Sequence, residues 1–374
     1  MAGIYIHIPF CKKICHYCDF YKTANLKLED DFINSVIKEI EIRSDFLDSE
    51  IETIYFGGGT PSAISINNLQ IILNNILQKF SVNKNSEITI ELNPDDINEE
   101  YLNQLLKLGF NRLSIGTQSF NNQILNYLNR RHNSEKAENS IKLALNVGYK
   151  NISVDLIYGI PNQTEQNLLD DISIISKYDV SHISAYHLTI EKNTYFGKLL
   201  KKGLLKQILD EKSFNFYKLV VNELQQLGFE QYEISNFARN SDYSKHNTNY
   251  WKNVAYLGLG PSAHSYNNKS RFWNYTPLTK YIEGINVSKF YEQEELSLNN
   301  LYNEFIMVSL RTKWGINLQH ILIEFGQMYY ENTIRIYLEN KNTNYIRREN
   351  DTIKLSTEGL FLSDFIIQEF FIIN

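Results

Sequence analysis

Three cysteines lie within eight residues, in the run Cys11-Lys-Lys-Ile-Cys15-His-Tyr-Cys18, and the chain has no other cysteine. Thiolates at this CxxxCxxC spacing can reach one centre from a single loop, and they favour iron–sulfur clusters, zinc or copper(I). A [4Fe–4S] cluster normally takes four cysteine ligands, so three would leave one iron open to a substrate or cofactor. A zinc site completed by His16 and three unrelated buried thiols are the alternatives. The spacing alone does not choose among them.

A glycine-rich run, Gly57-Gly-Gly-Thr-Pro61, is the second candidate feature. Glycines permit close backbone approach and positive φ, so the N–H groups of such a turn can cup an anion such as a carboxylate. The run lacks the lysine and the spacing of a phosphate-binding P-loop. The simpler interpretation is a tight turn. Because the run follows one expected strand as the cysteine loop follows another, we favour a cofactor cradle.

Short apolar segments alternate with helical patterns six times in the first part of the chain. Strands are expected at residues 4–8, 53–56, 87–92, 112–115, 152–157 and 182–188. Strands that alternate with helices predict parallel βαβ units with right-handed crossovers. We therefore expect an α/β fold in which six units form a partial (βα)6 TIM-like barrel.

Polar residues gather where these strands end. The cysteine loop, the glycine run, Glu91, Gln118, Asp155 and His187 all follow or close an expected strand. In (β/α) barrels the active site lies on the face formed by the carboxyl ends of the strands. Each polar residue alone could be a satisfied buried group or a helix cap. The whole set at one rim predicts a functional site there.

The character of the chain changes near residue 295. Apolar residues at helical spacing predict three helices, and Asn350-Asp351 between two short apolar segments predicts a hairpin turn. We expect three parts: a barrel at residues 1–230, a connecting segment at 231–295, and a small α+β, winged-helix-like C-terminal domain at 296–374. Basic residues are sparse in this last part, so binding of DNA is not expected.

The last apolar stretch, residues 360–373, is too short to span a bilayer and is interrupted by Asp364 and Glu369. We expect a core helix of the small domain, with contact to a membrane surface as the alternative.

The composition agrees with a folded protein of a reducing compartment. Of 374 residues, 43% are hydrophobic, which is enough for a sizeable core, and the formal net charge of −6 disfavours nonspecific binding to nucleic acid or acidic membranes. Clustered cysteines do not make a disulfide framework. The N-terminal residues lack the pattern of a signal peptide. We expect a cytoplasmic protein.

These motifs together resemble the radical S-adenosylmethionine (SAM) superfamily. Within it, the chain resembles the oxygen-independent coproporphyrinogen III oxidase group in the segments Tyr5–Cys11, Gly57–Pro61, Gln118–Phe120, Asn129–His132, Asp155–Pro161 and Gly258–His264. The similarity covers essentially the whole chain. It favours the iron–sulfur cluster over zinc.

The resemblance implies a role for each matched residue. Cys11, Cys15 and Cys18 would ligate a [4Fe–4S] cluster whose open iron chelates SAM. The residues implied to line SAM are Tyr5, Tyr17, Gly58, Gly59, Thr60, Glu91, Gln118, Arg130 and Asp155, with Tyr186 as a weaker candidate. Thr60 and the glycine N–H groups suit a carboxylate, and either acid could hold an ammonium or ribose hydroxyls.

The chain departs from the oxidases in two ways that instead match the heme-chaperone branch of the same group. The cysteine motif of the oxidases has the form CxxxCxxCxC, and in this chain Phe20 stands at the position of the last cysteine. They also carry an N-terminal extension before the first strand, whereas this chain starts at that strand. In addition, His246-Asn-Thr-Asn-Tyr-Trp251 fits the HNxxYW pattern of the chaperone branch. A lone histidine is usually a surface residue, but this resemblance implies that His246, Tyr250 and Trp251 contact heme.

The resemblance therefore implies a heme chaperone that binds heme and transfers it to acceptor proteins, with membrane-bound respiratory proteins as one candidate class. It would carry a [4Fe–4S] cluster, bind SAM, work as a monomer or homodimer, and touch a membrane at most peripherally. The alternatives are an oxygen-independent coproporphyrinogen III oxidase and a radical enzyme unrelated to heme. We expect no oxidase activity, and the sequence assigns no catalytic residue.

Overall fold

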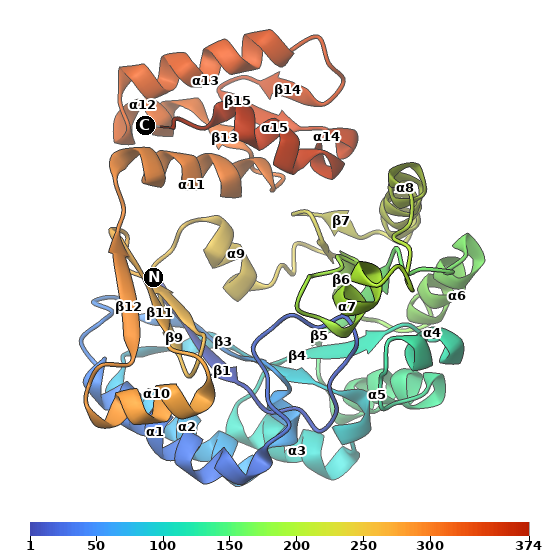
Figure 1. The fold of residues 1–374 in the computed structure, drawn as a ribbon, viewed down its shortest axis with the longest axis vertical. Coiled ribbons are helices and arrows are strands. Elements are labelled where there is room, and N and C mark those ends of the chain that lie inside the picture. The colour runs from blue at the N-terminus through green and yellow to red at the C-terminus, as the bar shows by residue number, and fades with distance from the viewer. Residues whose placement is uncertain (374) are drawn as a thin grey trace.

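The computed structural model describes residues 1–373, and within them a twelve-stranded sheet forms the body of the molecule (Figure 1). Its central strands pair in parallel in chain order: β1 Ala2–Ile8, β2 Ile51–Gly58, β3 Val82–Leu92, β4 Arg112–Gln118, β5 Asn151–Tyr158 and β6 His182–His187. The predicted six-stranded partial barrel is confirmed.

The strand sequences explain this placement. Six of the seven residues of β1 are buried, as expected for a parallel strand covered on both faces. Helices cover the outer face of the sheet: α1 Glu29–Ile42, α2 Ile66–Lys79, α3 Glu99–Leu108, α5 Ser134–Val147, α6 Glu165–Ile175 and α8 Asp210–Gln226 (Figure 1). Side chains that accept a backbone N–H begin several of them, as Ser65 does for α2 and Asn98 for α3. The short helices α4 (Asn122–Tyr127) and α7 (Tyr195–Lys201) lie beside the barrel mouth.

Residues 231–295, expected to be a connecting segment, extend the sheet at both edges. β9 (Tyr256–Leu259) pairs in parallel with β1, and β10 (His264–Tyr266), β11 (Ser270–Asn274) and β12 (Tyr291–Glu295) follow in antiparallel pairing. Helix α10 (Leu278–Asn286) connects the last two of these strands. At the opposite edge, β8 (Asn236–Ala238) and β7 (Glu230–Gln231) continue from β6.

The C-terminal residues form their own hydrophobic cluster, around Tyr302, Ile306, Ile321, Ile353 and Phe370. The elements that supply it are α11 Leu298–Leu310, β13 Ile316–Asn317, α12 Leu318–Glu324, α13 Gln327–Asn340, β14 Ile346–Glu349, β15 Thr352–Leu355, α14 Thr357–Phe361 and α15 Ser363–Phe370. The expected helices and hairpin are present, and the hairpin turns at Asn350 with a φ of 54°. Because this cluster is separate from the barrel core, we propose a domain boundary near residue 296.

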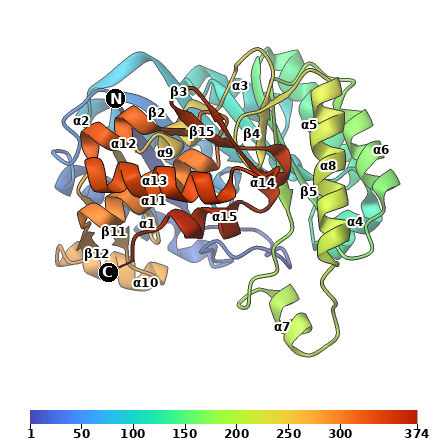
Figure 2. The same cartoon turned by 90° about the horizontal axis from the view of Figure 1, so that it is seen from above.

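Helix α9 (Lys245–Trp251) lies between the barrel and the C-terminal elements (Figure 1) and contacts β1, β2 and α11. The C-terminal elements cover one side of the barrel, and α8 lies beside them (Figure 2). No helix among residues 1–373 combines the length and the apolar character needed to cross a membrane.

Candidate functional site

A cavity of about 420 Å³ opens at the carboxyl ends of the central strands. All three cysteines line it, together with ten other residues that the sequence had singled out: Tyr17, Gly58, Gly59, Thr60, Glu91, Gln118, Arg130, Asp155, Tyr186 and His187. The parallel order of the strands produces this convergence, since each strand delivers its terminal residues to the same rim.

The cysteine loop is anchored by backbone hydrogen bonds, from Cys11 N to Thr23 O at 2.9 Å and from His16 N to Leu128 O at 3.1 Å. All three thiols are free. Burial raises the pKa of Cys11 to about 11, so this thiol is protonated at neutral pH and must lose its proton when it binds a metal. The Cys11 Sγ lies 3.4 Å from Thr60 Oγ1, which joins the loop to the glycine run.

His16, the fourth ligand of the zinc alternative, does not line the cavity. Its Nδ1 lies 3.0 Å from the carbonyl oxygen of Tyr127, and its ring stacks on Tyr195 with centroids 4.1 Å apart. Across residues 1–373, no three histidine, cysteine or acidic side chains converge closely enough to hold a single metal ion. The three cysteines border one cavity.

The glycine run closes tightly on its neighbours. A Cβ at residue 59 would meet the backbone of Pro9 at 2.8 Å, and one at residue 57 would meet Glu91 Oε1 at 2.9 Å. The N–H groups expected to cup an anion are used inside the protein, because Gly58 N donates to Glu91 at 3.2 Å and Gly59 N donates to Ile8 O at 2.8 Å. The glycines therefore provide clearance, and the polar side chain of the turn is that of Thr60, whose hydroxyl lies beside Cys11.

The two acids of the rim are both half-buried. Glu91 accepts a hydrogen bond from Tyr55 at 2.9 Å, and Asp155 accepts one from Ser114 at 3.1 Å. Burial raises the pKa of Glu91 to about 7, although the Tyr55 bond opposes this shift. Burial likewise raises the pKa of Asp155 to about 6. These carboxyls gain and lose protons near neutral pH, and a cationic ligand in the cavity would favour their charged forms.

Arg130 reaches the site from the loop after α4. Its Nη1 donates to Cys15 Sγ at 3.3 Å and its Nη2 donates to Gly116 O at 2.6 Å. The guanidinium thus joins the cysteine loop to the end of β4 and places a positive charge beside the thiols.

Tyr5 was expected at this site, but it lines a different cavity of about 380 Å³ that also includes Phe20, Tyr250 and His264. The Phe20 side chain is 71% exposed at the border between the two cavities, since it lines both. Several residues of the main cavity were not anticipated, including Lys22, Asn93, Ser114 and Thr189. Ser114 left a signal in the sequence as the polar residue of an apolar strand, and Asn93 did so as the residue that directly follows an expected strand.

The HNxxYW segment forms most of α9, and the side chains of His246 and Tyr250 contact each other. His246 is only 2% exposed. Its Nδ1 lies 2.8 Å from Thr53 Oγ1 and its Nε2 lies 3.0 Å from the Tyr250 hydroxyl, so iron could bind only if one bond broke. Trp251 lines a third cavity, of about 550 Å³, below the C-terminal elements.

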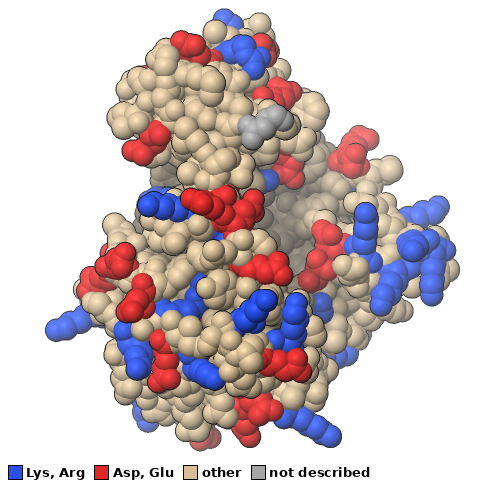
Figure 3. Space-filling view, turned by 60° about the vertical axis from the view of Figure 1, so that its left-hand side comes forward, with Lys and Arg blue, Asp and Glu red and all other residues tan. Residues whose placement is uncertain are grey.

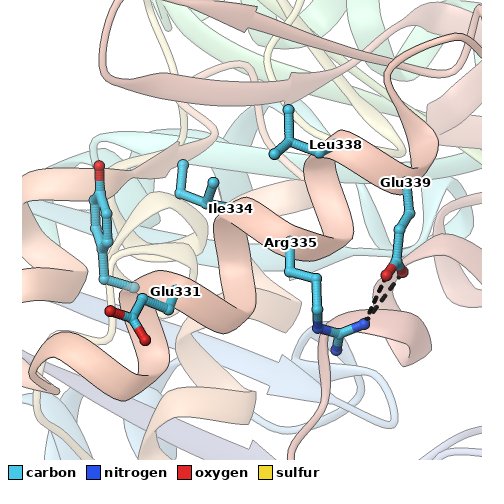
Figure 4. Close-up of a pocket in the computed structure, with 6 residues that line it drawn as sticks. Glu331, Ile334, Arg335, Leu338 and Glu339 are labelled. Atoms are coloured by element: carbon cyan, nitrogen blue, oxygen red, sulfur yellow. Dashed lines mark hydrogen bonds and ion pairs between the residues drawn. The ribbon is translucent and has the colours of Figure 1, made fainter.

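A hollow on the outer face of α13 is formed by neighbouring residues of one helix, among them Ile334 and Leu338, with Arg335 paired to Glu339 at 2.9 Å (Figure 4). It receives residues from no other element and is not a candidate site.

Comparisons with known proteins agree with this geometry. The profile described as the radical SAM superfamily matches residues 5–175. The heme chaperone HemW of Lactococcus lactis is 31% identical over 98% of this chain and 96% of its own length. The heme chaperone HemW of Bacillus subtilis is 35% identical over 87% of this chain and 88% of its own.

Among solved structures, the coproporphyrinogen III oxidase HemN of Escherichia coli, whose structure is described as that of a radical SAM enzyme, superposes with a TM-score of 0.86. The match covers 99% of this chain and 89% of that one at 21% identity, and at this identity it shows the shared fold.

Proposed function

The chain belongs to the radical SAM superfamily and, within it, to the family of the heme chaperone HemW, and from this membership we propose that it binds heme and transfers it to acceptor proteins. The observation that carries the proposal is the 31% identity to a relative of that name over 98% of the chain. Phe20, in place of the additional cysteine expected in the oxidases, supports the chaperone over the oxidase.

We propose that Cys11, Cys15 and Cys18 hold a [4Fe–4S] cluster. Three free thiols border one cavity, and the chain offers no fourth cysteine. Three thiolate ligands are the set expected for a cluster with one open iron. A bound cluster would supply an open coordination position and single electrons to a ligand in the cavity. The protein itself supplies the Arg130 charge beside Cys15 and the Thr60 hydroxyl beside Cys11.

SAM is the proposed ligand of the rest of the cavity. Glu91 and Asp155 are the acids available to its ammonium or ribose hydroxyls, and Thr60 and Arg130 are candidate donors to its carboxylate. Tyr17, Gln118 and Tyr186 complete the lining. Tyr5 would contribute only indirectly, by packing against Tyr55 with ring centroids 6.0 Å apart.

The alternative function is oxygen-independent oxidation of coproporphyrinogen III. The observation in its favour is the fold shared with the oxidase of Escherichia coli. Nothing of the oxidase chemistry follows from the fold alone, because one fold can host several functions.

A heme titration and a transfer assay test the proposal. The anaerobically reconstituted protein should bind hemin with a defined Soret band and pass it to the apo form of a heme protein faster than free hemin exchanges. The same preparation, reduced and supplied with SAM, should not convert coproporphyrinogen III. Absence of hemin binding would refute the chaperone function, and formation of protoporphyrinogen would establish the alternative.

Heme-accepting proteins are the proposed partners, and the cytoplasm is the proposed location. Light scattering would decide between a monomer and a homodimer.

A further inference from the structure

Below the C-terminal elements lies the aromatic cleft, which we define as the cavity of about 550 Å³ between the end of α9 and helices α11 and α12. The residues that the argument uses are Trp251 and Lys252 from α9, Phe305 from α11, Trp314, and His320 and Glu324 from α12. The surface is hollowed between the C-terminal elements and the rest of the molecule (Figure 3). We propose that heme binds in the aromatic cleft with His320 as its iron ligand. This inference rests on the proposed function and locates its site.

The walls of the cleft suit a flat apolar macrocycle. Phe305 and Phe325 lie on the C-terminal side with ring centroids 5.7 Å apart, and Trp251 and Trp314 also line the cleft. Aromatic side chains supply large apolar contact area, and their rings stack on flat conjugated partners. The lining comes from α9 on one side and from the C-terminal elements on the other, so a ligand between them would be held from two sides.

His320 provides an imidazole at the edge of these walls. Its ring packs against Phe305 with centroids 4.7 Å apart and is exposed on the cleft side. Its backbone N–H donates to Asn317 Oδ1 at 3.0 Å. Within residues 1–373 neither ring nitrogen has a hydrogen-bond partner, so a lone pair is available to iron without loss of a protein contact.

His246 is placed differently. Both of its nitrogens are bonded, and its backbone N–H donates to the buried carboxylate of Glu87 at 3.0 Å. A ligand role for His246 would require rearrangement of a packed core, whereas His320 needs none. The HNxxYW segment would then serve heme through Trp251, while His246 positions α9.

The charges of the cleft fit the heme propionates at one end. The Lys252 ammonium lies over the Trp314 ring, 4.9 Å from its centroid, and is exposed. It is therefore placed to pair with a propionate at the end of the cleft nearer α9. Glu324 also lines the cleft, but it comes from the C-terminal turn of the helix that carries His320. A propionate facing Glu324 would be repelled, so the two charges orient the macrocycle.

The test separates iron ligation from macrocycle binding. In the full-length protein, His320→Ala should shift the Soret band and weaken hemin binding about tenfold or more, a change equivalent to about 1.4 kcal/mol per factor of ten. Iron-free protoporphyrin IX should bind wild type and His320→Ala alike, because the aromatic walls remain. In both it should quench tryptophan fluorescence, since Trp251 and Trp314 line the cleft. Lys252→Gln should weaken binding of both porphyrins.

His264→Ala is the matched control, because His264 is also exposed but lines the cavity with Tyr5 and Phe20. It should leave hemin binding unchanged. An unchanged Soret band and affinity in His320→Ala, with a loss in His264→Ala or in a folded His246→Ala, would overturn the assignment while the chaperone function stands. A wild-type protein that binds no hemin would overturn both. Melting curves confirm that each variant is folded.

Discussion

Arg130 Nη1 lies 3.3 Å from the Sγ of Cys15, although 115 residues separate them in the chain. The same guanidinium donates to the Gly116 carbonyl, so one half-buried cation connects the cysteine loop with the end of β4. A fixed positive charge beside a cluster ligand favours the more negative, reduced state of the cluster.

Arg130→Leu should therefore lower the reduction potential of the reconstituted cluster by on the order of 60 mV, a tenfold change in a one-electron equilibrium. Arg130→Lys is the control, because it retains the charge but loses the planar fork, and its potential should lie closer to that of wild type. Potentiometric titration followed by electron paramagnetic resonance measures both. Equal potentials in Arg130→Leu and wild type would contradict the expected electrostatic role.

Substitution of Cys11, Cys15 or Cys18 by Ala should each abolish the cluster, since no other cysteine can replace the lost ligand. Iron and acid-labile sulfide in anaerobically reconstituted variants measure the outcome. A variant that keeps the full wild-type complement of both would remove that residue from the ligand set. Stoichiometric zinc in the wild-type protein would favour the single-ion alternative.

Glu91 should make the stability of the metal-free protein depend on pH. Burial raises its pKa to about 7 in the folded chain, well above the ordinary value of 4.5. Between these values the folded state holds a proton that the unfolded state has lost, so the free energy of unfolding falls as the pH rises, by on the order of 3 kcal/mol at most. Glu91→Gln should remove this slope and exceed wild type in stability at pH 8, as urea denaturation at pH 5 and pH 8 would show. Parallel pH profiles for the two proteins would argue against an ionising Glu91 with a raised pKa.

Coproporphyrinogen III should not be oxidised by this protein, because Phe20 occupies the position at which the oxidase motif has a further cysteine. An anaerobic assay with reductant and SAM, analysed by chromatography for protoporphyrinogen, measures the activity. Phe20→Ala is a comparison variant that should stay folded, because the Phe20 side chain is 71% exposed and its removal should cost little stability. Product formation by wild type at a rate above that of a cluster-free variant would overturn the expectation.

Deletion of residues 360–374 should unfold the C-terminal domain. Ile366, Ile367 and Phe370 of α15 are buried in its hydrophobic cluster, and loss of several such side chains costs several kcal/mol. Limited proteolysis should then cut within α11–α13 while the barrel resists. Phe365, which is 70% exposed, is the residue through which the membrane alternative would act. A truncated protein that stays folded but no longer binds liposomes would establish that alternative.

The sequence predicted the barrel and its rim well, because continuous apolar runs fix buried parallel strands and strand ends fix the position of Glu91, Gln118 and Asp155. It could not predict β12, whose residues Tyr291–Glu295 are mostly exposed and polar and have no strand pattern. The contacts of His246 could not be predicted from the sequence either, because its partner Thr53 is 193 residues away in the chain. Local patterns report burial and periodicity, whereas such pairs depend on how β2 and α9 come together.

The parallel pairing of β1 with β9 sets an order for the assembly of the molecule. Gly3–Ile6 lie beside Tyr256–Leu259, so β1 is completed by a strand made some 250 residues later. A growing polypeptide that has emerged only as far as β6 leaves this flank of β1 without its neighbour, and such unpaired strand edges promote aggregation. Closing a contact between positions so distant in sequence is also slow. The cysteine loop that directly follows β1 is therefore attached to an incomplete sheet until late in synthesis. Incorporation of a metal cluster into this loop then competes in time with the late pairing of β9 and β1.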